Sequence, residues 1–502
     1  MTDAPFDSSD SPRSSAPLRY AQHVTFAEPL PLELGGELPA VGVSYETYGR
    51  LNAHGDNAVL ICHAISGDSH VARHDPADDP GWWDIVVGPG KPIDTDRYFV
   101  ICPNVLGGCR GSTGPNSLDP RTGRPYGADF PTITVGDMVE VQRRLIDHLG
   151  IASLRAVAGG SLGGHQAITW ATSHATRVHG CVALATSARL TSQALAFDVV
   201  GRNAILHDPG FHGGQYYDRG GPSVGLALAR MLAHVTYLSR EAMTAKFDAS
   251  RLQPKEVPTF FEKKFSVGSY LAYQGHKFVE RFDANSYITL SMAMDLFDLG
   301  GASAQLRSVF ARSRCRWLVI SYSSDWLFPP EQSAQIVEAL IAANRPVSYC
   351  NVETAGGHDS FLLEEKLSVY GGMMRAFIDH CGQDIPVPVM TGASTVAAVD
   401  EPTSIFHGQR LDYEMILELI PRGASVLDLG CGTGALLSFL RARGHQRVVG
   451  VELDERALLA CVECGLDVVQ CDLEQGLSSF TDGQFDVVVL SQTLQSVVDT
   501  EG

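Results

Sequence analysis

The amino-acid sequence has no long apolar run. Hydrophobic residues make up 44% of its 502 positions, but no uninterrupted stretch reaches the roughly 18 apolar residues that a membrane-spanning helix needs. Residues 1–18 are rich in Ser, Asp and Pro and contain no hydrophobic segment, which is typical of a flexible tail and not of a signal peptide. The sequence therefore predicts a soluble protein that does not enter a membrane.

Positive charge and paired cysteine motifs are also scarce. The 38 Lys and Arg residues are outnumbered by 57 Asp and Glu, for a net charge of −19, which disfavours binding to nucleic acids and anionic membranes. The 11 cysteines are odd in number and scattered through predicted strands, as in a reducing cytoplasm. Cys461 and Cys464 form a C-x-x-C pair, but it lies in a predicted helix and has no second pair to complete a zinc site. These features predict a cytoplasmic protein.

The most informative stretch that is present spans residues 156–164, Ala-Val-Ala-Gly-Gly-Ser-Leu-Gly-Gly. Residues 159–163 fit the pattern G-x-S-x-G directly after an apolar strand and before a helix-forming segment, which is the setting of a nucleophile elbow. A sharp turn there lifts the serine oxygen above the sheet, and flanking glycines avoid Cβ clashes. Ser161 is the predicted nucleophile, although a plain Gly-rich turn fits the same pattern in a chain with 50 glycines.

A serine hydroxyl needs a base to take its proton, and the base needs a carboxylate to orient it. In α/β-hydrolases these groups follow in the order Ser, Asp, His. Asp325 follows the apolar run 316–321, and His358 follows the next β-rich run, 347–352, in a Gly-flanked loop at a predicted helix start. Taken singly, each also fits a helix cap or a surface loop. All three at strand ends in this order predict a triad of Ser161, Asp325 and His358.

The oxyanion formed when Ser161 attacks an acyl group needs two backbone N–H donors. One is predicted from Leu162, the residue after the nucleophile, and the other from Ile65, in the loop after the strand 58–62. The same loop holds His63 and His70. Because they lack the spacing and the acidic companions of a metal site, we expect ordinary polar roles for both and no metal.

Four longer stretches carry a family resemblance: 63–71, 159–164, 225–239 and 277–287. Together they resemble homoserine O-acyltransferases of the MetX type over residues 20–381. The resemblance implies an α/β-hydrolase core from residues 19–187 and 301–382, a helical lid from residues 188–300, and a homodimer. It also implies transfer of an acyl group from acyl-CoA to the hydroxyl of L-homoserine in methionine biosynthesis, through an acyl-serine and without a catalytic cofactor.

Matched by position, the resemblance makes Ser161 the acylated residue, His358 the general acid and base and Asp325 its orienting carboxylate. It also implies that the homoserine carboxylate is bound by Arg230 and Tyr237, which are seven residues apart and so lie two turns apart on one helix face. An Arg side chain offers a carboxylate a bidentate fork.

Two charge requirements follow from this assignment. Asp359 matches the residue that holds the substrate ammonium, and an acid next to the catalytic His can keep a cation close to the base. Because the chain is strongly acidic, CoA would have to be attracted by a local basic patch.

The acyl donor depends on a weaker signal at position 327. Family members that use succinyl-CoA typically carry Arg two residues after the catalytic Asp, where it could bind the distal carboxylate, whereas this chain has Leu327. Burying a carboxylate against Leu is costly, so the sequence favours acetyl-CoA. Succinyl-CoA is the alternative, with Arg110 as another basic candidate. Two other functions also fit the sequence, a serine hydrolase and a non-catalytic scaffold. L-Serine also fits as the acceptor in place of L-homoserine.

A second unit follows the acyltransferase-like part. Residues 383–404 are low in aromatics and rich in Pro, Thr, Ala and Val, as in a linker. In residues 405–502 a strand runs into a Gly-rich turn and then a helix, which lets a nucleoside approach the carboxyl edge of a parallel sheet. This segment resembles MetW, a methyltransferase-like protein. The resemblance implies a partial Rossmann-like domain with an S-adenosylmethionine site formed by Asp428, Gly430, Gly432, Gly434, Glu452 and Asp472.

The length of this second unit argues against methyl transfer. It has about 98 residues, roughly half of what a complete methyltransferase needs, so the sequence predicts a truncated regulatory or stabilising module. Such a partial sheet would leave an open edge unless it docks on the acyltransferase part or on a partner chain. A tight strand-to-helix connection without any ligand fits the Gly-rich turn as well.

Overall fold

The computed structural model describes residues 18–248, 265–382, 411–477, 479–491 and 493. The predicted linker 383–404 and all but the last residue of the predicted tail 1–18 lie outside the described residues. Within the described part, one 12-stranded sheet runs through both predicted units, in the order β1-β4-β8-β5-β9-β10-β11-β12-β15-β14-β13-β16.

The strands of this sheet are mostly four to eight residues long. They are β1 (Gln22–Phe26), β4 (Val41–Tyr48), β5 (Ala58–Cys62), β8 (Phe99–Pro103), β9 (Ala156–Gly160), β10 (Gly180–Leu184), β11 (Arg316–Tyr322), β12 (Val347–Val352), β13 (Val426–Leu429), β14 (Val448–Glu452), β15 (Asp467–Gln470) and β16 (Val487–Val489). Two small ribbons pair β2 (Leu30–Pro31) with β3 (Glu37–Leu38) and β6 (Val87–Gly88) with β7 (Ile93–Asp94).

Helices cover the sheet and form a separate layer above it. They are α1 (Val135–His148), α2 (Leu162–Ser173), α3 (Ser192–Leu206), α4 (Ser223–Tyr237), α5 (Arg240–Phe247), α6 (Ser266–Val279), α7 (Ala284–Asp295), α8 (Ser303–Phe310), α9 (Pro330–Ala342), α10 (Leu367–His380), α11 (Leu411–Leu419), α12 (Ala435–Ala442) and α13 (Glu455–Glu463), with the short 3₁₀ segments η1 (Gly127–Asp129), η2 (Pro209–Gly214), η4 (Gly357–Leu362) and η5 (Leu473–Gln475). None of the described helices is both long and apolar enough to cross a membrane.

The direction of the strands positions the site. β1, β4 and β8 pair antiparallel, and every neighbouring pair from β8 to β16 is parallel. The carboxyl ends of parallel strands lie at one edge of a sheet, where α/β proteins bind their ligands. Ile65, Ser161, Asp325 and His358 each follow one of these strands, so the topology brings them to the same edge.

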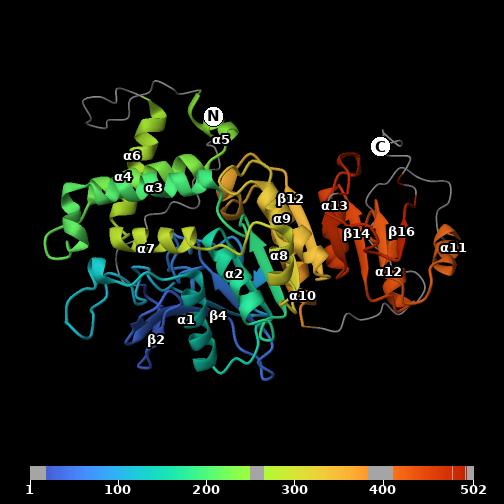
Figure 1. Ribbon diagram of the computed structural model, residues 1–502, viewed down its shortest axis with the longest axis horizontal. Coiled ribbons are helices and arrows are strands. Elements are labelled where there is room, and N and C mark those ends of the chain that lie inside the picture. Colours follow the sequence, from blue (N-terminus) through green and yellow to red (C-terminus); the bar gives the residue numbers. More distant parts are fainter. Residues whose placement is uncertain (1–17, 249–264, 383–410, 478, 492, 494–502) are drawn as a thin grey trace.

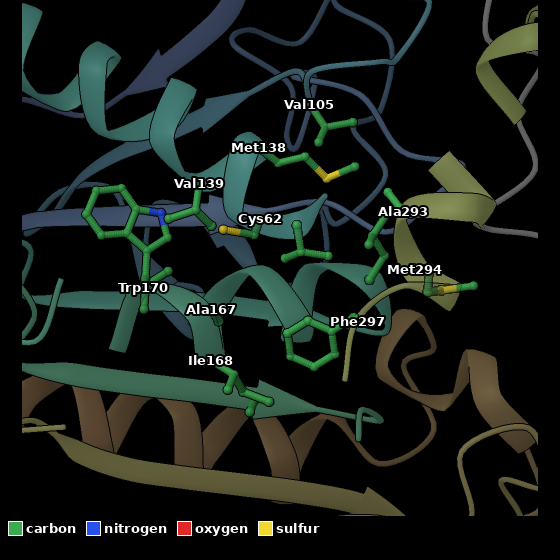
Figure 2. Packing of buried hydrophobic residues seen from close by; sticks show 14 of the residues in the cluster. Cys62, Val105, Met138, Val139, Ala167, Ile168, Trp170, Ala293, Met294 and Phe297 are labelled. Carbon is green, nitrogen blue, oxygen red and sulfur yellow. The ribbon is translucent and has the colours of Figure 1, made fainter. Parts of the chain in front are cut away.

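Two apolar cores lie on the two faces of the sheet. Along β5, Leu60 and Cys62 face one core and Val59 and Ile61 face the other, as the pleat of a strand requires. Figure 2 shows part of the first core, where Cys62 of β5 lies among side chains that include Trp170 of α2. All five residues of β5 are buried and apolar, which is typical of a parallel strand covered on both faces.

The helices α3, α4, α6 and α7 come from the predicted lid region and lie together at the upper left of Figure 1. The α7 residues Ala293 and Met294 join the first core beside the sheet (Figure 2). The inner part of this layer is therefore built into the core and not merely laid over it.

The second unit docks on the acyltransferase-like part through its sheet. β15 pairs in parallel with β12 at Val469 and Tyr349, and the Gln470 side chain accepts a hydrogen bond from the backbone N–H of Asn351 at 2.6 Å. The second core continues from α10 into α12 and α13. The edge that the sequence would leave open toward the acyltransferase is thus paired, and β16 ends the described sheet.

Candidate active site

Ser161 lies at the turn between β9 and α2 in a conformation that few non-glycine residues adopt. Its φ is 58° and its ψ is −125°, a strained backbone that costs about 1–3 kcal/mol and is usually kept for function. The neighbouring Gly163 allows the close approach that this turn needs, because a Cβ there would lie 2.1 Å from the carbonyl oxygen of Cys62. This geometry matches the predicted nucleophile elbow.

His358 and Asp325 meet in the buried interior above β11 and β12. The His358 Nδ1 lies 2.7 Å from Asp325 Oδ2, and both side chains are almost fully buried. The other oxygen, Oδ1, accepts hydrogen bonds from the backbone N–H groups of Leu327 and Phe328 at 3.0 and 2.8 Å. An ionised carboxylate only accepts, so Nδ1 carries the proton and Nε2 is left for the substrate side.

Opposing effects set the pKa of His358. Burial disfavours the imidazolium, whereas the charge and hydrogen bond of Asp325 and the charge of Asp359 favour it, and the net result raises the pKa above its ordinary value. Phe328 stacks on the ring at a centroid distance of 5.0 Å and holds its plane. The His358 ring is thereby held in one orientation.

The predicted oxyanion loop is held from two sides. Val105 donates its backbone N–H to Nε2 of His63 at 2.9 Å, so Nδ1 of that ring carries the proton and donates to the Ala64 carbonyl at 2.8 Å. Arg281, just past α6, donates to the Ser66 carbonyl at 3.0 Å. Ile65 lies between these anchors and lines the same cavity as Ser161.

Arg230, Tyr237 and Asp359 line one cavity, as the sequence predicts for the acceptor site. Arg230 and Tyr237 both lie on α4, and the guanidinium carbon is 5.5 Å from the Tyr237 ring centroid. Among the described residues, the buried Nε of Arg230 has no hydrogen-bond partner. Three basic side chains, Lys246, Lys277 and Arg281, line the same cavity.

Ser161 opens into a second, mainly apolar cavity that Leu327 also lines. Arg110, the other basic candidate for binding a succinyl carboxylate, is instead 3.7 Å from the buried Asp68 and is not among the residues that line this cavity. Asp198 of α3, which sequence reasoning missed, does line it. Burial and a hydrogen bond to Asp295 raise its pKa well above the ordinary range. The one feature of the sequence that could have indicated this role is an acid within the apolar segment Ala-Phe-Asp-Val, residues 196–199.

The predicted nucleoside site lies at the same edge of the sheet, because β13, β14 and β15 run parallel to β12. Gly430, Gly432 and Gly434 have φ values of 74°, 54° and 80°, which favour glycine. Glu452, at the end of β14, accepts the Gly432 backbone N–H at 2.9 Å. Asp472 caps η5 by accepting the backbone N–H of Glu474, while Asp428 is buried in β13.

Two known families match separate parts of the chain. The alpha/beta hydrolase fold family matches residues 57–365, and the methionine biosynthesis protein MetW family matches residues 410–501. The whole chain is 54% identical over 501 residues to the bifunctional methionine biosynthesis protein MetXA/MetW of Rhodopirellula baltica, an alignment that covers 98% of this chain and 78% of that protein. The chain belongs to the MetX family of α/β-hydrolases, with a MetW unit fused behind it.

Further MetX relatives carry two different names. A homoserine O-acetyltransferase of Solidesulfovibrio magneticus is 51% identical and covers 70% of this chain and 89% of its own. A homoserine O-succinyltransferase of Alkalilimnicola ehrlichii is 49% identical, in an alignment that covers 74% of this chain and 98% of that protein. The predicted MetX and MetW resemblance is thereby confirmed.

Solved structures confirm the predicted α/β-hydrolase fold. The homoserine O-acetyltransferase from Bacillus anthracis superposes with a TM-score of 0.65 at 27% identity, over 73% of this chain and all of that one. Esterase E22 has the same TM-score at 29% identity, over 71% of this chain and all of its own. The fold is therefore shared by acyltransferases and esterases.

Proposed function

We propose that this protein transfers an acetyl group from acetyl-CoA to the hydroxyl of L-homoserine in methionine biosynthesis. Relatives named homoserine O-acetyltransferase and O-succinyltransferase at about 50% identity support the acyltransferase reaction, and the MetXA/MetW relative supports the pathway. Ser161 carries the acyl group, His358 moves the protons and Asp325 orients His358.

The observation that carries the proposal is the state of Arg230. The buried Nε of Arg230 has no partner among the described residues, which costs free energy, and the Arg230 side chain lines a cavity that Tyr237 and Asp359 also line. A homoserine carboxylate would pair with the guanidinium group of Arg230 and with Tyr237, while Asp359 would hold the ammonium group. An ester lacking both charges would leave these groups unused.

In the first half of the reaction Ser161 attacks the thioester carbonyl while His358 removes the hydroxyl proton. The backbone N–H groups of Leu162 and Ile65 stabilise the tetrahedral oxyanion. When the C–S bond breaks, His358 returns the proton to the CoA sulfur. An acetyl ester of Ser161 and free CoA result.

In the second half His358 removes the proton of the homoserine hydroxyl, whose oxygen attacks the acetyl-serine. The C–O bond to Ser161 then breaks, and His358 gives the proton back to the serine oxygen. O-acetylhomoserine leaves, and no metal or organic cofactor takes part. Water must be kept from the acyl-serine, a role that suits the α3, α4 and α7 layer whose residues line the Ser161 cavity.

The cavity beside Ser161 favours acetyl over succinyl. Its described lining is mainly apolar, contains no Lys or Arg, and includes the acid Asp198. A succinyl carboxylate would be buried there without a cation, which is costly. Relatives named for either donor are about equally similar, so this lining is what supports acetyl-CoA.

The basic side chains of the neighbouring cavity suit the other part of the donor. Lys246, Lys277 and Arg281 bring three positive charges to one cavity of a chain whose net charge is −19. Phosphate groups of CoA are attracted by such a local field. We assign this cavity to both homoserine and the entering CoA chain.

The test is CoA release by the purified protein with acetyl-CoA or succinyl-CoA, each with and without L-homoserine. We expect homoserine-dependent release that is faster with acetyl-CoA and absent in Ser161→Ala. Leu327→Arg should shift the preference toward succinyl-CoA, whereas Leu327→Met, which conserves volume, should not. Faster release from succinyl-CoA by the unaltered enzyme would overturn the donor assignment.

A serine esterase is the second candidate, because esterase E22 shares the fold at the same TM-score. Release of CoA at the same rate with and without homoserine would favour the esterase. L-Serine, run beside L-homoserine, tests the other acceptor. An acceptor-independent rate that survives Arg230→Ala would contradict the acyltransferase proposal.

We also propose that the MetW unit binds S-adenosylmethionine at the turn 430–434. The three positive φ values and the acid at the end of β14 support this. Glu452 would have to exchange its bond with Gly432 for ribose hydroxyls. Calorimetric titration of the full chain with S-adenosylmethionine should show binding that Glu452→Gln weakens, and absence of detectable binding by the full chain would overturn it.

We propose a homodimer in the cytoplasm as the working state. The outer face of the helical layer exposes apolar side chains at Val199 and Val200 of α3 and at Val224 and Leu228 of α4, which a second copy would cover. The free thiols of all 11 cysteines suit a reducing compartment. Light scattering should give twice the chain mass, and Val224→Glu with Leu228→Glu should give monomers.

A further inference from the structure

Three side chains with metal-binding atoms converge far from Ser161 in the sequence, at Glu46 of β4 and at His70 and His74 in the loop after β5. Glu46 Oε2, His70 Nδ1 and His74 Nε2 all lie within 4.8 Å of one another. Each nitrogen is 2.9 Å from the Glu46 oxygen. The expectation that His70 has no acidic companion is wrong, because its companion stands 24 residues away in the chain.

The hydrogen bonds around His70 turn one ring nitrogen toward the cluster. Nε2 lies 2.8 Å from the carbonyl oxygen of Asp79. A carbonyl only accepts, so Nε2 carries a proton and donates it. Nδ1 lies 2.9 Å from Oε2 of Glu46, a distance at which it also donates a proton to the carboxylate, so a bound cation would displace that proton. Metal-ligating histidines are typically oriented in this way by a backbone carbonyl.

Glu46 supplies a second, independent observation. Its side chain is 0% exposed, and Oε1 has no hydrogen-bond partner among the described residues. Meanwhile Oε2 faces three groups, since the Tyr48 hydroxyl also donates to it at 2.7 Å. A buried carboxylate oxygen without a partner is costly. A cation within reach of both oxygens would satisfy it.

We propose that Glu46, His70 and His74 form a binding site for one divalent zinc ion. Two imidazoles and one carboxylate are a ligand set that zinc favours, and a water molecule or the second oxygen of Glu46 would complete four positions. Tetrahedral ligands at about 2.0–2.1 Å from zinc are roughly 3.3 Å apart, so each nitrogen would move about 0.4 Å away from Oε2.

The surroundings already hold these ligands in place. The His74 ring lies between Tyr20 and Tyr48, with centroid distances of 4.3 Å to each. The backbone N–H of His74 donates to Asp78 at 2.9 Å, and Asp78 is also 3.9 Å from Nε2 of His70. The His74 side chain is 19% exposed, which gives an ion a way in.

The site would act as a clamp on the loop that contributes Ile65. Glu46 belongs to the sheet, whereas His70 and His74 belong to the same loop as the predicted oxyanion donor. A zinc ion would join the two by metal–ligand bonds in place of the present hydrogen bonds to Glu46. Zinc here is structural and lies outside the acyl-transfer steps.

The first experiment measures binding of zinc alone to full-length protein that has been stripped with a chelator and dialysed. We expect one zinc per chain and a rise in Tm on adding zinc. Cobalt(II) should bind in its place and give the visible absorption of a tetrahedral nitrogen and oxygen site. His74→Gln should weaken zinc binding at least about a hundredfold, because it removes a ligand and not only a supporting bond.

Two further variants keep the result interpretable. His276→Gln is the matched control, because His276 is exposed and only 3.6 Å from Glu280, so it should leave zinc binding unchanged. The variant Glu46→Gln should also fail to bind zinc. Because Glu46 is buried, this variant could misfold, in which case His74→Gln, at a partly exposed residue, supplies the test. No zinc or cobalt binding by the stripped protein, or binding that His74→Gln leaves unchanged, would overturn the proposal.

Discussion

His358 is surrounded by groups that pull its charge in opposite directions. Burial disfavours the imidazolium, and Asp325 and Asp359 favour it strongly enough to raise its pKa. Only the neutral ring can accept a proton from Ser161 or from homoserine. In the proposed mechanism Asp359, which would bind the acceptor ammonium, therefore also influences the pH range in which His358 can act as the base.

The rate should accordingly fall on the acidic side at a pH above the ordinary value of 6.5 for a histidine. Asp359→Asn removes one charge that raises the pKa, so the acidic limb of the kcat/KM profile should move to lower pH, in addition to any rise in KM. Glu364→Gln, which neutralises an acid five residues further on, is the control and should not move it. A limb that stays in place in Asp359→Asn would show that another group controls it.

In the proposed reaction, recognition of the homoserine acceptor depends most on Arg230. Replacing it with Lys keeps the charge but removes the planar fork, so we expect KM for homoserine to rise about tenfold to a hundredfold with a smaller change in kcat. Steady-state kinetics with homoserine varied at saturating acetyl-CoA measure this. Arg240→Lys, at the exposed start of α5, should behave like the unaltered enzyme, and an unchanged KM in Arg230→Lys would contradict the assignment.

At the scale of elements, the loop after β5 depends on other elements for its shape. His63 ties it to the segment after β8 through Val105, and Arg281 ties it to the helical layer through Ser66. Trp82 donates to the Asp68 carbonyl at 2.9 Å and fixes the far end. The loop is thus held by two other elements and by one bond of its own, which would keep the backbone N–H of Ile65 in a constant place, as oxyanion stabilisation requires.

Loosening this loop should lower kcat more than it raises KM. Loss of an oxyanion donor typically costs about a hundredfold or more in kcat, and displacing one by His63→Asn should cost about tenfold. Because Asn cannot span both Val105 and Ala64, the loop loses one anchor while the acceptor groups stay. His54→Asn, in an exposed turn, is the control. A change confined to KM would place His63 outside oxyanion positioning.

At the scale of the molecule, the two units share one sheet and one apolar core. β11 and β12 lead to Asp325 and His358, and β15 pairs with β12. Asp467 of β15 stands between two guanidinium groups, with Arg316 at 2.7 Å and Arg441 at 3.2 Å. Arg316 belongs to β11, so this buried group of charges crosses the junction.

Thermal unfolding measured by calorimetry should show whether the two units are coupled through this junction. We expect a single cooperative transition for the full chain. Asp467→Asn leaves two partly buried cations without their anion and should lower the free energy of unfolding by about 1–3 kcal/mol. Calorimetry should then resolve an earlier transition of the MetW unit. Asp482→Asn, an exposed acid of the same unit, should change little, and an unaltered single transition in Asp467→Asn would show that the junction rests on apolar packing alone.

Much of the site could be predicted because its signals are local. The turn around Ser161 needs glycines within a few positions, and Asp325 and His358 follow runs of apolar residues that form strands. These requirements act between consecutive residues, so they are visible in the chain order. The family resemblance added Arg230, Tyr237 and Asp359 in the same way, by position within continuous motifs.

The remaining features depend on which distant residues the packing brings together. Arg110 was a candidate for an acyl carboxylate, but the fold pairs it with Asp68. Glu46 of β4 and the histidines of the loop after β5 are too far apart in the chain for a local pattern to indicate their contact. Asp198 reaches the Ser161 cavity only through the packing of α3.

The amino-acid sequence by itself determined the family, the turn at Ser161 and the order of the candidate triad residues, because each is a property of neighbouring residues and their strand or helix. Only the tertiary structure decided that β15 pairs with β12, that Glu46 lies beside His70 and that one nitrogen of Arg230 has no partner among the described residues. Burial imposes those pairings, since a strand edge, a carboxylate or a guanidinium removed from water must find whatever partner the folded chain presents.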